Sequence, residues 1–483
     1  MHTAGYDAGQ TRQERTQAFR EKMQQAGLAS EVIALFSAYL EQLFASHEVG
    51  LIPEQSIHPL GAGDISHLND IQAEDVQTGR SLMDRSVLVK LNGGLGTSMG
   101  MPFAKSLLHV RTDRTFLDVI VQQAGLCAGR LSPLSLVLMN SFNTRQDTRA
   151  YLKKIGCAAE DNIFMFEQNQ YPKVLQDSMM PASCPEKPEL EWNPPGHGDF
   201  FAALHTSGML QQLLDQGKHY AFVSNADNLG AVLDPGLLGY FVRQGFPFLM
   251  EVAWRGVSDK KGGHIAKRDN GQLILREVAQ CPEEDLPAFQ DISTHCYFNT
   301  NNIWVNLQVL QKRIEQDGLP RLPLIVNPKT LNPRDSQTPK VYQLETAIGA
   351  AIGIFENSAA ILVDRDRFLP VKKTDDLLLV RSDCYVFGPD YQLKPNPAGK
   401  PESVKVELDD RFYKLVDDFE ARFPSGPPSL IECRSLTVKG DVRFGANVVC
   451  TGDVLLENTS GHQVQVKDNE VLTGHCVFEG DRI

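Results

Sequence analysis

The residues whose types and spacing could do chemistry begin in a glycine-rich stretch, SVLVKLNGGLGTSMGMPFAKSLLHV, residues 86–110. An apolar run stops at a series of glycines that ends with Gly100, and Lys105 follows five residues later. Glycines let backbone N–H groups approach an anion, and a loop between a strand and a helix can aim several such donors at a phosphate. The ammonium group of Lys105 would then lie beside the same anion. The stretch predicts a phosphate-binding loop, with a purely structural glycine turn as the alternative.

Two known phosphate loops do not fit this spacing. The Walker A pattern needs a lysine directly after its last glycine, but Met101 follows Gly100. A dinucleotide fingerprint needs G-x-G-x-x-G, and Gly94, Gly96 and Gly100 are spaced one residue too widely. A nicotinamide-dependent oxidoreductase is therefore disfavoured.

Polar residues at the ends of other apolar runs extend this set. Asn225 and Asp227 end the run HYAFVSNADN, and such a carboxylate suits Mg²⁺ when substrate phosphates supply further oxygens, although Asn and Asp also form turns. Asn299, Asn301 and Asn302 come just before an apolar run that we expect to be a strand. An amide offers both a donor and an acceptor, which suits sugar hydroxyls. These segments predict a site for a magnesium–phosphate ligand and a sugar.

A second turn, PPGHGDFFAAL, resembles the arrangement of the first. Gly196, His197 and Gly198 precede an amphipathic pattern that predicts a helix, with Asp199 near its cap. His197 is a candidate ligand-facing residue, and the alternative is that it packs at the start of the helix.

The elements that must position these residues alternate between apolar runs and helical patterns from Arg85 onward. Such alternation predicts an α/β core with a mostly parallel sheet covered on both faces. Ligands bind such sheets at the carboxyl ends of the strands. The loops after Leu91, Gln168, Asn225 and Trp254 are therefore where a site is expected.

Both flanks of this core have patterns of their own. Residues 11–46 have helical periodicity, and residues 388–405 are rich in proline and glycine, as in a linker. An apolar residue then recurs every sixth position, with a break at Ser460, at Leu430, Leu436, Val442, Val448, Val454, Val466, Leu472 and Phe478. This period predicts a short parallel β-helix, with an ordinary β-meander as the alternative.

Composition excludes several classes of protein. The chain has 483 residues, 42% of them hydrophobic and 22% charged, which predicts a folded protein of two or three domains. A net charge of −13 argues against binding to nucleic acid or to an anionic membrane. Nine cysteines without a C-x-x-C pair, and the lack of a signal-like or membrane-spanning apolar segment, predict a cytoplasmic protein.

Seven ordered motifs between residues 86 and 386 carry a resemblance to a known family. They are KLNGGLGTSMG followed by KS, PPGHGD, VSNADNLGA, KGG, FNTNN, QLETAIGAAI and RFLPVKKTDDLLLV. Together they closely resemble the eukaryotic-like UTP:glucose-1-phosphate uridylyltransferases. The resemblance implies a Rossmann-like, GT-A-like nucleotidyltransferase core with a mixed, mostly parallel sheet and a C-terminal left-handed parallel β-helix. The expected domains are a helical region (1–85), a catalytic domain (86–386), and a linker with the β-helix (387–483).

The resemblance also implies roles for individual residues. Lys105 and Lys372 are expected to neutralise phosphate charge, Asp227 to hold Mg²⁺, and Gln168 to read uracil. The implied nucleotide-binding set is Leu91, Asn92, Gly93, Gly94, Gly96, Thr97, Gln168, Gly196 and Asn225. The implied substrate-binding set is His197, Gly263, Glu277, Asn299 and Asn301. The sequence MPFAKS departs from the family, which more often has a glycine-proline pair before the lysine and another lysine upstream.

The implied reaction joins UTP and glucose-1-phosphate reversibly into UDP-glucose and pyrophosphate, with Mg²⁺, by in-line attack of the sugar phosphate on the α-phosphorus. One alternative is a UDP-sugar or UDP-N-acetylhexosamine pyrophosphorylase, whose loop would more often begin AGG than the NGG at Asn92. Another is a non-catalytic nucleotide-sugar-binding regulator, which would be expected to lose Lys105, Asp227 or Lys372. No nucleic acid or membrane partner is expected, and a homo-oligomer could form through residues 430–483.

Overall fold

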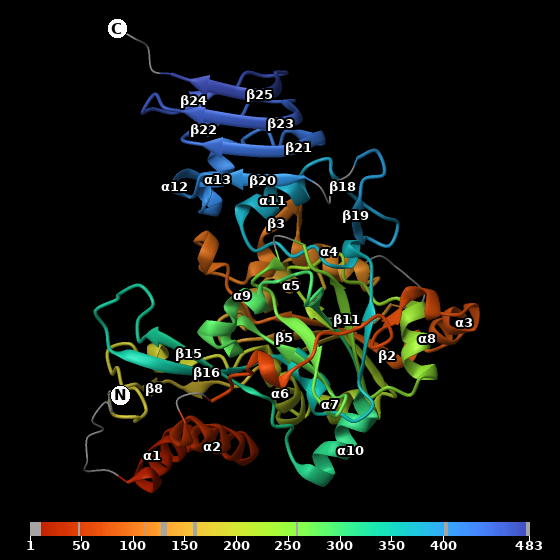
Figure 1. The fold of residues 1–483 in the computed structure, drawn as a ribbon, viewed down its shortest axis with the longest axis vertical. Helices are drawn as coiled ribbons and strands as arrows, with labels where there is room; N and C mark the ends of the chain where they lie inside the picture. The colour runs from red at the N-terminus through yellow and green to blue at the C-terminus, as the bar shows by residue number, and fades with distance from the viewer. Residues whose placement is uncertain are drawn as a thin grey trace.

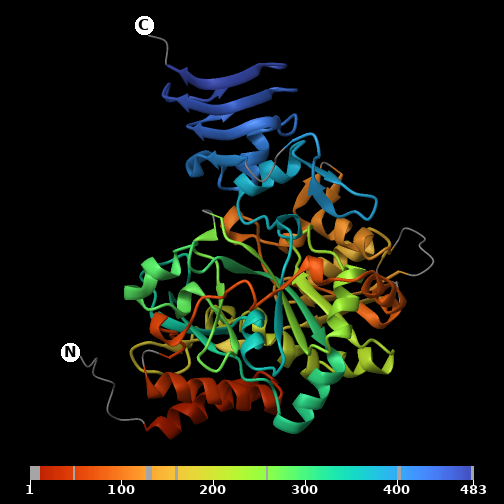
Figure 2. The same cartoon turned by 45° about the vertical axis from the view of Figure 1, so that its right-hand side comes forward.

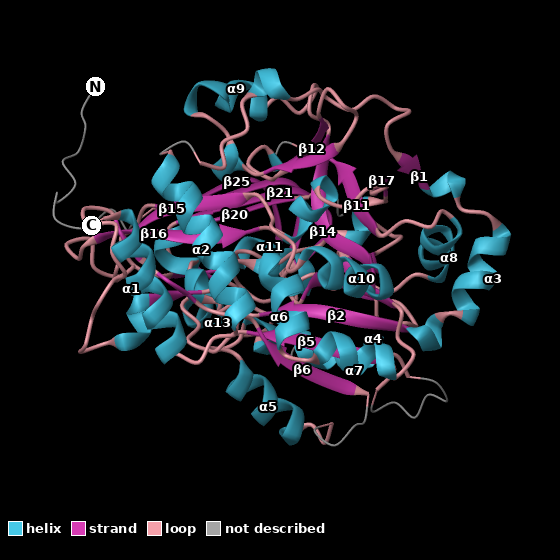
Figure 3. Ribbon diagram, turned by 90° about the horizontal axis from the view of Figure 1, so that it is seen from below, coloured by secondary structure: helices cyan, strands magenta, loops and turns pink. Residues whose placement is uncertain are grey.

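A ten-stranded mixed sheet organises the protein (Figure 1, Figure 3). The computed structural model describes residues 11–46, 49–111, 113–126, 133–157, 162–256, 259–399 and 404–479. In spatial order the main strands are β1 (Ser66–His67), β17 (Ala359–Leu362), β11 (Phe248–Trp254), β14 (Tyr297–Asn306), β10 (Tyr220–Asn225), β2 (Ser86–Asn92), β5 (Ser135–Asn140) and β6 (Ile163–Glu167). The hairpin of β12 (His264–Lys267) and β13 (Leu273–Arg276) attaches to β14.

Strand β14 is the exception to an otherwise parallel path. It runs antiparallel to both β10 and β11, whereas β10, β2, β5 and β6 are parallel to one another. The parallel strands β2 and β5 are buried almost throughout because helices cover both faces. The predicted mixed, mostly parallel α/β core is confirmed.

Alternating side chains divide the core into two layers. Leu88, Leu136 and Phe222 point into one layer, whereas Val87 and Val137 point into the other. The helices of the first layer are α4 (Phe116–Gln123), α5 (Arg145–Lys154), α8 (Pro235–Arg243) and α11 (Thr374–Arg381). Those of the second layer are α6 (Phe200–Thr206), α7 (Met209–Asp215) and α10 (Leu307–Asp317).

The helical pattern over residues 11–46 forms two helices, α1 (Arg12–Gln25) and α2 (Ser30–Ala45). Gly27 lies between them with φ of +75°, a conformation that stops a helix and favours glycine. The pair packs beside a three-stranded sheet of β8 (Val174–Leu175), β16 (Lys340–Thr346) and β15 (Leu324–Thr330). In Figures 1 and 2 this layer lies at the opposite end of the molecule from the C-terminal strands.

The rest of the predicted N-terminal region lies against the core. Strand β1 pairs with β17, and α3 (Ala73–Ser81) packs against α8. The domain boundaries at residues 85 and 386 stay predictions.

The six-residue ladder becomes a stack of parallel strands at the top of Figure 1. Strands β20 (Lys405–Leu408), β21 (Ser429–Lys439), β23 (Val449–Asn458) and β25 (Val471–Phe478) form one sheet, and β22 (Val442–Arg443) pairs with β24 (Val464–Gln465). Every ladder residue is buried except Phe478, which is half-buried. All of these neighbours are parallel, which contradicts a β-meander. The left-handed coil itself stays a prediction.

Short elements connect this stack to the core. The proline-rich segment 388–405 includes β19 (Leu393–Pro395), which forms a hairpin with β18 (Tyr385–Phe387), while its residues 400–403 lie outside the described part. Helices α12 (Asp410–Tyr413) and α13 (Val416–Arg422) follow. The apolar core of the stack is continuous with the layer that contains α4 and α11.

Close packing of α3 on α8 gives a first prediction. An alanine Cβ at Gly239 would lie 1.8 Å from the carbonyl oxygen of Asp75, which leaves no room for a methyl group. We expect Gly239→Ala to lower the free energy of unfolding by about 1–3 kcal/mol through overpacking. Thermal unfolding monitored by circular dichroism measures this. Gly63→Ala is the matched control, because its Cβ would meet no atom within 4 Å. Equal melting temperatures for the two variants would contradict the tight contact.

Candidate nucleotide and sugar-phosphate site

The glycine-rich loop leaves the carboxyl end of β2 and folds back on itself. The backbone N–H of Lys105 donates to the carbonyl of Gly94 at 3.1 Å, and Leu95 pairs with Ala104 as an isolated bridge. The loop is joined to the next strand end because the N–H of Ala226 donates to the carbonyl of Leu91 at 3.2 Å. These bonds bring Lys105 over the ends of β2 and β10.

Lys105 and Asp227 form the charged centre of the site. The Nζ of Lys105 lies 2.6 Å from Oδ2 of Asp227, and both side chains are less than one-fifth exposed. The other oxygen, Oδ1, is buried and has no hydrogen-bond partner among the described residues. An unpaired buried carboxylate oxygen is costly unless something else satisfies it. It fits a divalent cation that takes one protein carboxylate and completes its shell with substrate phosphates.

The second predicted phosphate lysine belongs to a segment tied to the same turn. Val371 donates its N–H to the carbonyl of Asp227 at 3.3 Å, and Pro370 pairs with Asn228. Lys372 follows directly and is exposed. Burial raises the pKa of Glu277, and the positive charge of Lys372 opposes this rise. Lys372 therefore lies within electrostatic reach of Glu277, beside the turn that carries Asp227.

The residues predicted for the sugar form one continuous chain of contacts. A Cβ on Gly263 would lie 2.5 Å from Oε2 of Glu277, and the carbonyl of Gly263 accepts from the N–H of Asn299 at 3.0 Å. The Oδ1 of Asn299 accepts from the N–H of Asn301, and the Nδ2 of Asn301 donates to Oδ1 of Asn225, both at 2.8 Å. The Oδ1 of Asn301 is buried and has no partner in the described chain. The site thus offers a free acceptor where a hydroxyl could donate.

The asparagines lie inside a strand, and the expectation that they precede it is wrong. Strand β14 begins at Tyr297, so Asn299, Asn301 and Asn302 all belong to it. A β-bulge opposite Glu251 explains how polar residues fit there, because it re-aims side chains at the edge of the pairing.

The residues predicted to bind the uracil base, which we call the base side of the site, are held by β2, β5 and β6. The N–H of Gln168 donates to the carbonyl of Asn140 at 2.8 Å, and a Cβ on Gly93 would lie 2.9 Å from Nε2 of Gln168. The side chain of Gln168 therefore rests on the glycine loop. The next residue, Asn169, donates its N–H to Oδ2 of Asp199 at 2.6 Å, and burial raises the pKa of Asp199 to about 7.

Asn92 belongs to the predicted nucleotide-binding set, but its side chain packs inside the core. It is buried, and its Nδ2 donates to Oδ1 of Asn140 and to Oγ1 of Thr148, both at 2.9 Å. Its amide therefore joins β2 to β5 and α5. Thr97 is exposed and begins a short 3₁₀ turn after Gly96, whose close neighbour is Met101.

His197 is held in one tautomer. The N–H of Ile348 donates to Nδ1 at 3.0 Å, so that Nδ1 accepts and Nε2 carries the proton. Burial lowers the pKa of His197 to about 4, which keeps the ring neutral at pH 7. Gly196 has φ of +78° and lies so close to the carbonyl of Thr346 that a Cβ would be 2.5 Å away. This turn can therefore present a neutral N–H donor beside the base side.

Lys90 is a residue that the sequence reasoning missed. It is fully buried in β2, and its Nζ donates to Oγ of Ser224 at 2.8 Å and to the carbonyl of Ala231 at 2.9 Å. Burial and the positive charge of Arg367 lower its pKa, against the opposing charges of Asp227 and Glu251, to about 7. Its signal in the sequence is a lysine in the middle of an apolar strand.

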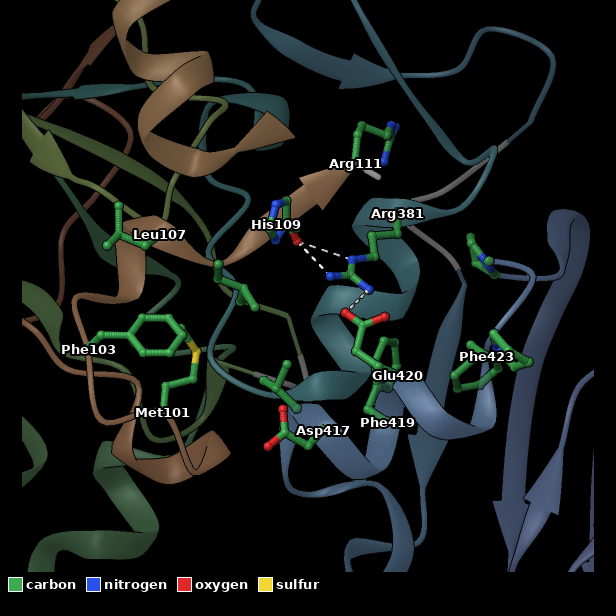
Figure 4. Close-up of a pocket in the computed structure, with 15 residues that line it drawn as sticks. Met101, Phe103, Leu107, His109, Arg111, Arg381, Asp417, Phe419, Glu420 and Phe423 are labelled. Carbon is green, nitrogen blue, oxygen red and sulfur yellow. Dashed lines mark hydrogen bonds and ion pairs between the residues drawn. The ribbon is translucent and has the colours of Figure 1, made fainter. Parts of the chain in front are cut away.

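A separate cleft of about 490 Å³ lies between the loop and the C-terminal stack, and contains none of the predicted site residues (Figure 4). Met101 and Phe103 line one wall, and α13 lines the other. Arg381 bridges the walls, since it donates to the carbonyl of His109 and pairs with Glu420 at 2.7 Å. The connecting helix α13 therefore lies across this cleft from the loop, and the lining of the cleft includes none of the predicted site residues.

The described residues contain neither a cluster of metal-binding side chains nor a helix that could span a membrane. No described group of three or more His, Cys, Asp or Glu side chains could hold a metal ion. A cation at Asp227 would thus depend on ligand phosphates. No helix in the described ranges is long and apolar enough to cross a bilayer.

A mixed α/β sheet with a glycine loop, two lysines and a lone carboxylate at its strand ends is typical of enzymes that bind phosphorylated ligands. The sequence pattern described as UTP–glucose-1-phosphate uridylyltransferase matches residues 32–451. The chain therefore belongs to the UTP–glucose-1-phosphate uridylyltransferase family.

Individual relatives agree with this placement. The Hordeum vulgare UTP–glucose-1-phosphate uridylyltransferase is 42% identical over 404 residues, which cover 83% of each chain. The Dictyostelium discoideum UTP–glucose-1-phosphate uridylyltransferase 2 is 37% identical over 90% of this chain and 86% of its own. A crystal structure of a mutant UDP-glucose pyrophosphorylase from Leishmania major with UDP-glucose is similar, with a TM-score of 0.88 and 41% identity. That alignment covers 98% of this chain and 100% of the other.

The lowered pKa of His197 predicts an acid-sensitive contribution to stability. As the pH falls from about 6.5 towards 4, the unfolded chain binds a proton on this residue while the folded protein does not. The stabilisation is present above pH 6.5 and is lost as the pH falls through this window, by at most about 1.4 kcal/mol per pH unit. Urea unfolding at several pH values measures it. His197→Asn keeps an acceptor for Ile348 and should show a shallower decline.

The control for this experiment is His462→Asn, an exposed histidine of the C-terminal stack. Its profile should follow that of the parent. Parallel profiles for the parent and His197→Asn would contradict a buried, neutral His197.

Proposed function

We propose that this protein transfers a uridylyl group from UTP to glucose-1-phosphate, forming UDP-glucose and pyrophosphate reversibly. The observation that carries the proposal is the buried Lys105–Asp227 pair with its unpaired carboxylate oxygen, next to the segment of Lys372. Membership of the family and the names of its relatives support it.

The barrier to this reaction is the meeting of two polyanions. Positive charge aimed at the non-bridging phosphate oxygens lowers it, and no nucleophilic side chain is needed. In the proposal, Lys105 leaves Asp227 to contact a phosphate of UTP, while Lys372 approaches from the opposite side. The sugar phosphate then attacks the α-phosphorus in line, and pyrophosphate leaves without a covalent enzyme intermediate.

Asp227 would hold Mg²⁺ through the oxygen atoms of its carboxylate, with the remaining positions filled by phosphate oxygens and water. The cation would supply charge neutralisation across the triphosphate. The departure of Lys105 from Asp227 would free both carboxylate oxygens for this purpose. The same exchange would move the ammonium group from a carboxylate to a phosphate.

Specificity would come from the two sides of the site. The amide of Gln168 can pair with the uracil edge, whereas cytosine presents the opposite donor and acceptor, so UTP should be preferred to CTP. The Nε2–H of His197 would donate to a phosphate oxygen. Glu277, Asn299 and Asn301 would bind hydroxyls, which would satisfy the free Oδ1 of Asn301.

We also propose a cytoplasmic location and assembly through the C-terminal stack. Seven described cysteines have free thiols, which supports a reducing compartment, whereas the disulfide bond of Cys157 does not. Strand β25 is an edge of its sheet and exposes Val471 and Val477, which a second copy could cover.

A substrate assay tests the proposed activity directly. The protein is mixed with UTP, Mg²⁺ and one sugar-1-phosphate at a time, and pyrophosphate release is measured. We expect release with glucose-1-phosphate, because the family and the relatives that the chain resembles are named for this sugar phosphate. Release with N-acetylglucosamine-1-phosphate alone would overturn the choice of sugar, and release with neither would overturn the reaction.

Substitution of Lys372 tests the phosphate role. Lys372→Ala should lower kcat by about 10²- to 10³-fold, since it removes one donor aimed at transition-state charge. Lys373→Ala is the matched control, because this neighbouring lysine is also exposed and its N–H, like that of Lys372, donates to Oδ2 of Asp376. Steady-state kinetics measures both. Equal kcat values for the two variants would remove Lys372 from the mechanism.

A further inference from the structure

A buried ion pair connects strand β14, which carries Asn301, to the segment that carries Lys372. Glu251 of β11 and Arg367 are almost completely buried, and Nη2 of Arg367 lies 2.7 Å from Oε1 of Glu251. The guanidinium also donates through Nε to Oε2 at 2.8 Å, so that the contact is bidentate. A bidentate pair fixes direction as well as distance, which a single charged contact does not.

Each carboxylate oxygen of Glu251 accepts two hydrogen bonds. Besides Arg367, Oε1 accepts from Nε1 of Trp304 and Oε2 accepts from Nδ2 of Asn302, both at 3.0 Å. Both partners belong to β14, the antiparallel neighbour of β11 in Figure 3. Of the four hydrogen bonds to this buried side chain, two come from Arg367 and two come from the strand that carries the sugar-side asparagines.

The pairing of β11 with β14 also contains the bulge that carries Asn301. Glu251 is opposite Asn302, but Val252 is opposite Asn299, so Thr300 and Asn301 are extra residues on β14. Thr300 donates its hydroxyl to the carbonyl of Glu251 at 2.7 Å. Asn301 has φ of +60°, an unfavourable backbone conformation that the surrounding bonds must hold.

On its other side, Arg367 fixes the segment that leads to Lys372. Its carbonyl accepts from Nδ2 of Asn302 and from Nδ2 of Asn228, both at 3.1 Å. Oδ1 of Asn228 accepts from the N–H of Leu369 at 2.9 Å. With the bond from Val371 to Asp227, these contacts attach residues 367–371 to the turn that carries Asp227.

We propose that the Glu251–Arg367 pair positions Asn301, Asp227 and Lys372 relative to one another, and that neither residue of the pair touches a substrate. This inference rests on the proposed function. The base side does not depend on the pair, because Gly93 and Gln168 are held by β2, β5 and β6. Loss of the pair should therefore affect turnover and the sugar phosphate while sparing the binding of uridine, which has no phosphate for Asp227 or Lys372 to contact.

Removal of one partner would leave an unpaired buried charge and endanger folding, so both are replaced together. The test variant is Glu251→Leu combined with Arg367→Met, since apolar replacement of a buried pair is often tolerated. We expect kcat to fall about 100-fold, as for a misplaced reacting geometry, and KM for glucose-1-phosphate to rise. The Kd for uridine, measured by calorimetry, should stay within about threefold of the parent, because uridine tests the base side alone.

The matched control is the pair of Asp75 and Arg243, which joins α3 to α8 at the outer side of the core (Figure 1). Asp75→Leu combined with Arg243→Met should leave kcat unchanged, whatever its effect on the melting temperature. If the first double variant does not fold, Arg367→Lys takes its place, because lysine keeps the charge but loses the bidentate contact. That variant should lower kcat at least about tenfold.

Hydrogen exchange gives a readout that does not depend on activity. Amides of residues 298–302 and 368–373 should exchange faster in the variant, and those of 93–97 and 168–169 should not. Normal kcat in a folded variant, or a parallel loss of uridine affinity and kcat, would overturn the positioning role. An inactive parent would instead overturn the proposed function, and exchange would still decide whether the pair orders these segments.

Discussion

The site depends on holding positive charge ready for phosphate before any phosphate is present. An isolated ammonium group in a partly buried place is costly, so the protein pairs Lys105 with Asp227 at 2.6 Å. The pair is strong enough to order both side chains, yet it leaves Oδ1 of Asp227 unsatisfied. In the proposed mechanism, a ligand that brings phosphate and a cation would supply partners to both groups, so that its binding would exchange one set of charge contacts for another.

The base side and the sugar side of the site are built on different strands of the sheet. Strand β10, which leads into Asp227, lies between β2, whose loop carries Gly93, and β14, which carries Asn301. The base side is built on parallel strands buried on both faces, whereas the sugar side is built on the one antiparallel strand and its bulge. Asp227 therefore lies at the junction of two independently supported halves, where the transferred phosphorus must pass from one ligand to the other.

Hydrophobic periodicity in the sequence correctly predicted the helices and strands whose form depends on neighbouring residues. The strand before the glycine loop, the helical pair over 11–46 and the buried ladder of the C-terminal stack all follow from hydrophobic period. The position of the asparagines did not follow, because a run of polar residues also fits a turn. Their place inside β14 depends on Glu251, about fifty residues earlier, and on a bulge that no local spacing reveals.

Sequence reasoning also could not tell which polar residues face a ligand. Lys90 and Asn92 belong to β2, the strand that leads into the glycine loop. Their side chains nevertheless donate hydrogen bonds to core residues, Lys90 to Ser224 and Asn92 to Asn140. If Asn92 distinguishes glucose enzymes from acetamido-sugar enzymes, it does so through the packing of β2 against β5, since both hydrogens of its Nδ2 are already bonded to Asn140 and Thr148. Buried polar bonds of this kind set the direction of a strand end more tightly than apolar contacts do, because each bond has a preferred angle as well as a distance.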